Sequence, residues 1–236
     1  MKALRPFFTF YGGKWRAAPR YPAPVHKTIV EPFAGSAGYS LRYPGRQIIL
    51  VEKDPIIAAT WRFLIGVTPL EILALPDLSP GQSVDDLNVC EEARRLIGWW
   101  CTRGASSPGK SLTAWGRDPR YRNQFWGPAA RIRIASQVDE IRHWRLIDDS
   151  YENTPNIEAT WFVDPPYEVA GKHYRVSDID YSALGQWCRS RRGQTIVCEN
   201  DGATWLPFRH FMDAKANESK TGGKVSREAI WTGSGE

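Results

Sequence analysis

The sequence predicts an α/β fold whose core is a mostly parallel β-sheet. Short apolar runs of strand length at 28–31, 48–51 and 161–163 each lead directly into a loop. A fourth run, 195–199, follows a helical pattern, and strands that alternate with helices are typical of parallel β–α–β units. The chain has 236 residues, of which 42% are hydrophobic and 24% are charged. This length and composition suit one soluble globular domain, or a core that carries one large insertion.

Two helices are predicted from their caps and from their apolar spacing. Asp54 supplies an N-cap and Pro55 a first helical residue, and the apolar pattern that follows ends at Gly66. A second amphipathic pattern predicts a helix over 181–191, with Asp180 as its cap. Each helix would connect two neighbouring strands of the sheet.

Residues 67–145 interrupt this alternation and carry most of the positive charge. The chain has 31 Lys and Arg against 26 Asp and Glu, a formal net charge of +5. The stretch 94–133 contains nine basic residues and one acid, a net +8, so the remainder of the chain has a net charge of −3. Six aromatic residues lie among these cations: Trp99, Trp100, Trp115, Tyr121, Phe125 and Trp126. Because cations attract phosphates and flat rings can stack on bases, we expect this stretch to contact nucleic acid.

The last part of this interruption has its own helical pattern. Apolar residues recur at Ile134, Val138 and Ile141, which predicts a helix over 129–142 that returns the chain to the core.

Several protein classes are excluded by composition. The cysteines show neither a CxxC spacing nor a grouping with His, so we expect reduced thiols and no metal site. No run approaches the roughly 18 apolar residues of a membrane span. The N-terminal residues lack the pattern of a secretory signal, and we expect a cytoplasmic protein.

A loop of small residues follows the first predicted strand. Residues 32–38 read Pro-Phe-Ala-Gly-Ser-Ala-Gly, and such loops let a nucleotide or an amino-acid carboxylate approach backbone amides closely. Glu52 stands at the end of the next strand, where an acid can accept hydrogen bonds from ribose hydroxyls. The two features predict a cofactor site at this edge of the sheet.

The sequence Asp164-Pro165-Pro166-Tyr167 directly follows the apolar strand 161–163. Two consecutive prolines end the strand and hold an extended backbone that offers carbonyl groups but no amide hydrogens. An aspartate, a carbonyl and an aromatic ring at one strand end can grip a planar group that bears an NH₂. We therefore expect this tetrapeptide to bind a substrate amine.

These motifs, with Tyr11-Gly12-Gly13-Lys14 near the N-terminus, resemble those of the DNA adenine-N-6 methyltransferases of the solitary and phage-encoded kind. The resemblance covers most of the chain outside 67–145. It implies a Rossmann-like class I methyltransferase sheet of seven strands, the last of them antiparallel, with an inserted and mainly helical target-recognition domain. Residues 227–231 look like that last strand, and 215–226 look like the mobile hairpin loop before it.

The resemblance also implies a division of the chain. Residues 1–66 would form the cofactor-binding half of the catalytic domain, 67–145 the target-recognition insert, and 146–236 the half that carries the Asp-Pro-Pro-Tyr motif.

The implied cofactor is S-adenosylmethionine, with S-adenosylhomocysteine as the product. The implied cofactor-binding residues are Tyr11, Gly12, Lys14, Pro32, Phe33, Ala34, Gly35, Ser36, Ala37, Glu52, Lys53, Asp149, Ser150, Tyr151 and Asp164. We expect Lys14 to pair with the methionine carboxylate of the cofactor. Ala37 stands where the family has a glycine, and alanine fits there if its φ is negative.

The predicted activity is transfer of a methyl group to the exocyclic amine of adenine in DNA. The predicted catalytic residues are Asp164, Pro165, Pro166 and Tyr167. The Asp164 carboxylate and the Pro165 carbonyl would accept both amino hydrogens, and Tyr167 would stack on the extruded base. No metal is required. This hypothesis requires Asp164 to face a hollow of cofactor size and not to be tied up in a buried ion pair.

The predicted partner is double-stranded DNA, bound by a monomer in the cytoplasm with the nucleoid or with phage DNA, without a membrane or an obligatory protein partner. The residues predicted to contact DNA are Arg103, Lys110, Arg117, Arg120, Arg122 and Asn123. Recognition could be site-specific or relaxed. The alternative substrates are the cytosine amine, the glutamine amide of a release factor, and adenine in RNA. The alternative from another class is a DNA-binding relative without activity.

Overall fold

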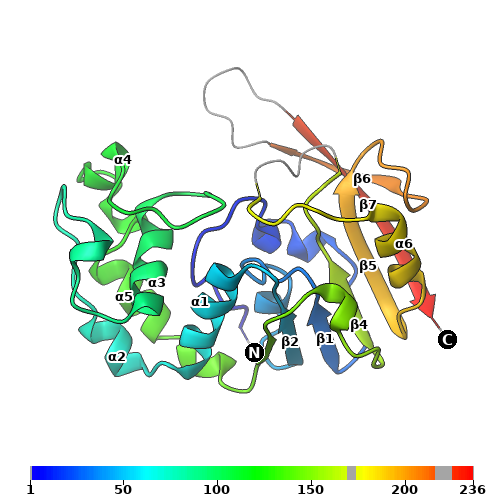
Figure 1. Ribbon diagram of the computed structural model, residues 1–236, viewed down its shortest axis with the longest axis horizontal. Coiled ribbons are helices and arrows are strands. Elements are labelled where there is room, and N and C mark those ends of the chain that lie inside the picture. The colour runs from blue at the N-terminus through cyan, green and yellow to red at the C-terminus, as the bar shows by residue number, and fades with distance from the viewer. Residues whose placement is uncertain (1, 169–173, 216–224, 236) are drawn as a thin grey trace.

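A seven-stranded sheet forms the centre of the computed structural model, which describes residues 2–168, 174–215 and 225–235 (Figure 1). The strands are β1 (Thr28–Glu31), β2 (Gln47–Val51), β3 (Arg145–Ile147), β4 (Ala159–Val163), β5 (Gly193–Asn200), β6 (Arg209–Lys215) and β7 (Val225–Gly235). Their order in the sheet is β3-β2-β1-β4-β5-β7-β6. Strands β1 to β5 are parallel, and β7 is antiparallel to both β5 and β6. The predicted α/β class with a mostly parallel sheet is confirmed, and the sheet is compatible with a Rossmann-like fold.

The predicted strands are the inner ones of the sheet. The four apolar runs correspond to β1, β2, β4 and β5, and the segment 227–231 lies in β7. Strands β3 and β6 were not predicted because they are the two edges of the sheet, where polar side chains remain exposed and no apolar run is needed. Most of the predicted hairpin loop, 216–224, lies outside the described residues.

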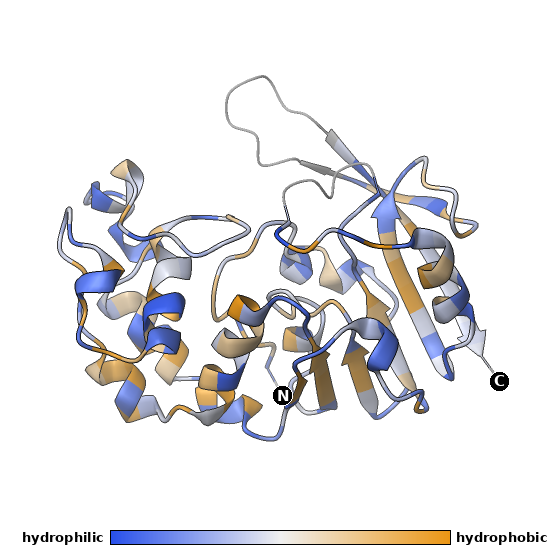
Figure 2. Cartoon of the chain, in the orientation of Figure 1, coloured by the Kyte–Doolittle hydropathy of each residue, from blue (hydrophilic) through white to orange (hydrophobic). Residues whose placement is uncertain are grey.

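The two faces of the sheet carry separate hydrophobic clusters. Side chains alternate between the faces along each inner strand: Ile29 and Phe162 belong to the larger cluster, and their neighbours Val30 and Trp161 to the smaller one. Figure 2 shows apolar residues concentrated in the inner strands, with hydrophilic residues common in the loops and on the outer helix surfaces. The smaller cluster is covered by the helix between β4 and β5, and the larger one by the N-terminal segment and the helices of 55–135.

The helices are α1 (Pro55–Gly66), α2 (Pro69–Ala74), α3 (Glu91–Cys101), α4 (Ala114–Arg117), α5 (Pro128–Ala135) and α6 (Tyr181–Arg189). Short 3-10 helices lie at Lys14–Arg16, Ala18–Arg20, Ser40–Arg42, Val84–Asp86, Arg122–Gln124, Val138–Ile141 and Tyr151–Asn153. Helix α1 begins and ends as predicted, with Asp54 accepting a hydrogen bond from the Ile56 amide. Asp180 caps α6 as predicted, but α6 ends at Arg189, two residues before the predicted end.

The predicted helix over 129–142 is wrong as one continuous element. Helix α5 ends at Ala135, and a separate 3-10 helix follows at Val138–Ile141. The interruption lies at Gln137, whose buried side-chain amide hydrogen-bonds to both the backbone N–H and the carbonyl of Arg5. The predicted apolar positions Ile134, Val138 and Ile141 are nevertheless all buried.

Four of the six aromatic residues in the basic stretch belong to the core. Trp99, Trp100, Phe125 and Trp126 are buried. Trp99 stacks on Phe8 at 5.4 Å between ring centroids, so the helices between α1 and β3 share their core with the sheet. The expectation that all six rings offer stacking surfaces is therefore wrong, because the chain uses four of them for packing. In the described part of the chain, no helix combines the length and apolar character needed to cross a membrane.

Candidate functional site

The candidate site lies at the carboxyl edge of the sheet, where β1, β2 and β4 end side by side. Beside β1 the strand order changes direction: β2 lies on one side of it and β4 on the other. Loops that leave neighbouring strands at such a point diverge and open a crevice, where ligands bind in sheets of this kind. The loops that follow these strands are 32–39, 52–54 and 164–167, which contain the sequence-predicted motifs.

A pocket that is open to solvent occupies this crevice. The predicted residues that line it are Pro32, Phe33, Gly35, Glu52, Lys53, Ser150, Tyr151, Asp164 and Pro166. A smaller adjoining hollow is lined by the predicted residues Tyr11, Gly12, Lys14, Phe33, Ala34, Gly35, Ser36 and Asp164. Asp164 thus lines both hollows.

The loop after β1 turns tightly, and a buried acid, Glu31, hydrogen-bonds to the backbone that follows it. Glu31 accepts a 2.7 Å hydrogen bond from the Ser40 amide, and burial raises the pKa of its carboxyl to about 8 although that bond opposes the shift. Gly35 has a φ of +46°, and Ala37 a φ of +51°. The condition under which alanine fits there, a negative φ, is therefore not met, and the Ala37 amide donates a hydrogen bond to the Ala34 carbonyl at 2.6 Å. Ala37 lines neither hollow.

Glu52 connects the ends of β1 and β2. One carboxylate oxygen accepts the Gly35 amide at 2.9 Å and the other accepts the Asp54 amide at 2.9 Å. Glu52 is buried, and this burial raises the pKa of its carboxyl to about 7 even though the amides favour the charged form. The carboxylate therefore fixes the glycine loop while it also lines the larger pocket.

Two glycines leave room for close packing around the N-terminal motif. A Cβ on Gly38 would lie 2.6 Å from the Trp15 amide nitrogen, so only glycine lets the segment that carries Lys14 lie against the loop. Gly12 has a φ of +72°, and a Cβ added to it would lie 2.3 Å from the Tyr174 hydroxyl oxygen. Both glycines are thus required for close packing at the site.

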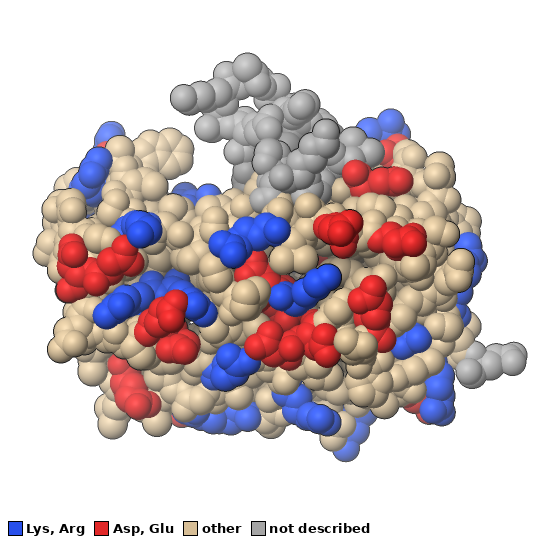
Figure 3. Space-filling view, viewed as in Figure 1, with Lys and Arg blue, Asp and Glu red and all other residues tan. Residues whose placement is uncertain are grey.

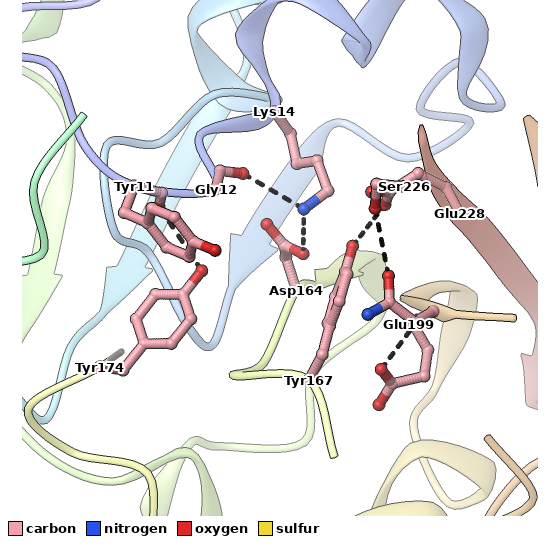
Figure 4. A network of polar contacts seen from close by, with 10 residues as sticks. Tyr11, Gly12, Lys14, Asp164, Tyr167, Tyr174, Glu199, Ser226 and Glu228 are labelled. Carbon is pink, nitrogen blue, oxygen red and sulfur yellow. Dashed lines mark hydrogen bonds and ion pairs between the residues drawn. The ribbon is translucent and has the colours of Figure 1, made fainter. Parts of the chain in front are cut away.

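Lys14 and Asp164, which both line the smaller hollow, form an ion pair (Figure 4). Lys14 Nζ lies 2.8 Å from Asp164 Oδ1, and the side chains are 10% and 19% exposed. Burial by itself would lower the pKa of Lys14, but the nearby carboxylates of Asp164 and Glu228 outweigh it and hold this pKa above its ordinary value. Burial also raises the pKa of Asp164, and the Lys14 ammonium opposes only part of that shift. The second requirement is thus not met in this state, because the carboxylate already has a cation.

Tyr167 stands next to this ion pair. Lys14 Nζ lies 4.7 Å from the centroid of its ring, and its hydroxyl donates a 2.6 Å hydrogen bond to Glu228 on β7. The carbonyl of Pro166 accepts a bond from the Tyr181 hydroxyl at 2.7 Å, which fixes the backbone of the motif to α6. The role predicted for the Pro165 carbonyl, acceptance of an amino hydrogen, stays a prediction.

Only part of the segment 148–151 reaches the pocket. Ser150 and Tyr151 line it, and the Tyr151 ring lies 5.2 Å from that of Phe33. Asp149 lines neither hollow and instead accepts bonds from the Ser150 amide and the Asn153 side chain. Its carboxylate stabilises the local turn.

One wall of the larger pocket was not predicted. It is formed mainly by residues 174–180, and Arg175 in this segment pairs with Asp54 at 3.3 Å. The lining residues that sequence reasoning missed are Phe10, Asp54, Ile57, Ser106, Glu152, Tyr174, Arg175, Val176, Asp178, Ile179 and Asp180. Asp54 could have been found from its place at the end of β2, where it was interpreted only as a helix cap. The segment 174–180 has no motif that could have indicated it.

The predicted DNA-contacting cations divide into paired and unpaired groups. Lys110 pairs with Asp85 at 2.8 Å and Arg120 with Asp118 at 2.6 Å. Within the described residues, the side chains of Arg103, Arg117 and Arg122 form no ion pair or hydrogen bond, and Asn123 is exposed. Trp115 is 60% exposed and Tyr121 38%, with ring centroids 6.0 Å apart. In Figure 1, α4 stands on the side of the molecule toward which β5 points, the side of the pocket.

Comparison with known proteins gives no functional assignment. No family model matches the chain, and no curated protein matches it. One similar solved structure is described as a conserved hypothetical protein from Streptococcus pyogenes, with 11% identity and a TM-score of 0.34 over 86% of this chain and 84% of that one.

Proposed function

We propose that this protein transfers a methyl group from S-adenosylmethionine to the exocyclic amine of adenine in double-stranded DNA, as the motifs resembling those of the solitary and phage-encoded enzymes imply. The observation that carries the proposal is that Glu52, the small-residue loop after β1 and Asp164 line one pocket at the carboxyl edge of the sheet. The Lys14 ammonium lies 2.8 Å from the Asp164 carboxylate and 4.7 Å from the Tyr167 ring centroid, the position that the sequence predicts for a substrate amine. The natural setting of this activity is the cytoplasm, on nucleoid or phage DNA.

Several features of the pocket support S-adenosylmethionine as its ligand. Glu52 would hold the ribose, and the Phe33 and Tyr151 rings would offer flat apolar surface to an adenine. Several acids line the pocket, and Figure 3 shows acidic side chains gathered over this part of the face among a few basic ones. A sulfonium is a cation, so an acidic lining favours it. When bound, the cofactor would supply a methyl carbon activated by the positive sulfur.

Asp164 would act on the amine of the extruded base. The lone pair of that nitrogen is delocalised into the purine ring, which makes the amine a weak nucleophile. Hydrogen bonds accepted by the Asp164 carboxylate and by the Pro165 carbonyl favour a pyramidal nitrogen with a free lone pair. Positive charge would develop on the nitrogen as it bonds to the methyl carbon and the carbon–sulfur bond breaks to leave S-adenosylhomocysteine, and the nitrogen would then lose one hydrogen as a proton to solvent. The carboxylate would therefore stabilise the transition state more than the ground state.

The ion pair with Lys14 is consistent with this role if the pair is exchanged during the reaction. Breaking a buried pair leaves an uncompensated charge and costs roughly 3–5 kcal/mol. We propose that Lys14 transfers to the cofactor carboxylate and that the positive charge developing on the substrate nitrogen then compensates Asp164. Asp164 would thus face the Lys14 ammonium before the reaction and the positively charged substrate nitrogen in the transition state.

The exposed edge around α4 supports DNA as the partner. Three arginines that form no ion pair within the described residues and two exposed rings lie in 103–122, and α4 in this stretch stands on the same side of the molecule as the pocket. Extruding a base from a duplex costs a few kcal/mol. Stacking on Tyr167 would return roughly 1–3 kcal/mol of this, and phosphate contacts to the arginines would contribute to the rest.

The test is methyl transfer from a tritiated donor to unmethylated plasmid DNA, followed by digestion to nucleosides. Label on the N6 position of adenine is the expected result. Label on cytosine instead, or transfer only to RNA or to a release factor, would assign one of the alternative substrates. Binding of DNA and of the cofactor without any transfer would indicate an inactive relative. Each of these outcomes contradicts the proposal.

A further inference from the structure

A buried acid on β7 faces the catalytic motif from the far side of Tyr167. Glu228 is 8% exposed, and its carboxylate accepts the Tyr167 hydroxyl at 2.6 Å on one oxygen and the Ser226 hydroxyl at 3.0 Å on the other. Figure 4 shows the Tyr167 ring between the Lys14–Asp164 pair on one side and Ser226 and Glu228 on the other. No motif in the sequence indicated this residue.

Two sets of contacts hold Tyr167, one at its backbone and one at its hydroxyl. The two prolines and the bond from Tyr181 to the Pro166 carbonyl hold its backbone. The ring also packs against the larger hydrophobic cluster and lies beside Lys14, and the bond to Glu228 holds its hydroxyl end. The acceptor is itself oriented by Ser226, whose hydroxyl also lies 3.3 Å from the Asn200 side-chain oxygen on β5.

A purely structural role is a poor explanation for an acid at this position. Burying a carboxylate costs free energy that a well-packed apolar residue would not, and Glu228 lies close enough to Asp164 to raise the pKa of that carboxyl further. Two acids are thus held around one ammonium. The free energy lost by burying this carboxylate is explained if the orientation of the ring matters for the reaction.

We infer that Glu228 is a positioning residue, which holds the Tyr167 ring in the plane that the extruded base requires. The inference rests on the proposed function, since the ring acts on the base and not on the cofactor. Through this bond the C-terminal strand, whose described residues line neither hollow, takes part in substrate binding.

The test is a double-mutant cycle on methyl transfer to plasmid DNA. The variants are Glu228→Leu, Glu228→Gln, Tyr167→Phe, the double Glu228→Leu/Tyr167→Phe, and Arg227→Gln as a control on the same strand. A hydrogen bond to a charged group corresponds to a factor of at least about ten, so Glu228→Leu and Tyr167→Phe should each lower kcat about tenfold. The double variant should lose no more than either single variant, because both remove the same bond.

Two further measurements separate positioning from a general effect on folding. Glu228→Gln retains an acceptor and should keep kcat within about threefold of the wild type. The rise in melting temperature with S-adenosylmethionine should be the same in every variant. Losses that multiply in the double variant, an unaffected Glu228→Leu, or a Glu228→Gln as slow as Glu228→Leu would each overturn the inference. A wild-type protein that binds cofactor but labels no DNA would refute the proposed function, and the inference would fall with it.

Discussion

Lys14, near the N-terminus, and Asp164, directly after the central strand β4, meet as a largely buried ion pair at the edge of the sheet. Gly38 allows the N-terminal segment to lie on the loop after β1, and β4 ends where the aspartate that follows it can reach that segment. The pair stands between the hollow assigned to the cofactor and the ring assigned to the base. Its exchange is the step on which the proposed reaction depends.

Replacing Asp164 should separate chemistry from cofactor binding. Asp164→Ala removes the acceptor of the amino hydrogens, and we expect methyl transfer to fall below detection while the dissociation constant of S-adenosylmethionine changes only a few-fold. Tritium transfer and calorimetric titration measure the two quantities. Equal losses in both would show that Asp164 serves mainly to bind the cofactor.

Lys14→Gln should have the opposite effect on binding. It removes the cation proposed for the cofactor carboxylate, so the dissociation constant of S-adenosylmethionine should rise at least about tenfold, the value of a charge-assisted hydrogen bond. Lys27→Gln, an exposed lysine outside the site, is the control. Unchanged cofactor affinity in Lys14→Gln would leave the ion pair with Asp164 as a structural contact alone.

Cofactor affinity should increase with pH between about 6 and 8. Burial raises the pKa of Glu52 to about 7, and ribose hydroxyls donate to the ionised carboxylate, so deprotonation favours binding. Calorimetry across this range should show the dissociation constant falling as pH rises. Glu52→Gln should bind more weakly and without this dependence; a variant with the wild-type slope would assign the titration to another group.

Glu31 should make the fold less stable as pH rises. Burial raises the pKa of this carboxyl to about 8, above its unfolded value, so the native state binds the extra proton. The contribution to the free energy of unfolding is full below about pH 4.5 and is lost as pH approaches 8. Urea unfolding should show a flatter pH profile for Glu31→Gln than for the wild type, and parallel profiles would contradict the assignment.

The unpaired arginines should account for more of the salt dependence of DNA binding than the paired one. Replacing Arg103, Arg117 and Arg122 by alanine should lower the slope of log K against log salt by about 0.9 for each phosphate that the protein no longer neutralises. Arg120→Ala serves for comparison because Asp118 already neutralises that side chain. An unchanged slope in the triple variant would place the DNA surface elsewhere on the molecule.

The sequence alone was sufficient for the inner strands, for α1 and for the three loops at the carboxyl edge. Each depends on a local signal: an apolar run, a cap such as Asp54 with Pro55, or prolines that end β4. The resemblance also implied that Glu52 and Asp164 belong to one cofactor-binding set.

Only the tertiary structure decided which side chains these residues contact. The pairing of Lys14 with Asp164, the wall at 174–180 and the bond from Tyr167 to Glu228 join segments that are distant in the chain and share no sequence pattern. It likewise assigned four of the six aromatic rings to the core and bent Ala37 into a positive φ. Burial and long-range hydrogen bonds depend on what packs against a residue, and a linear pattern carries no record of that.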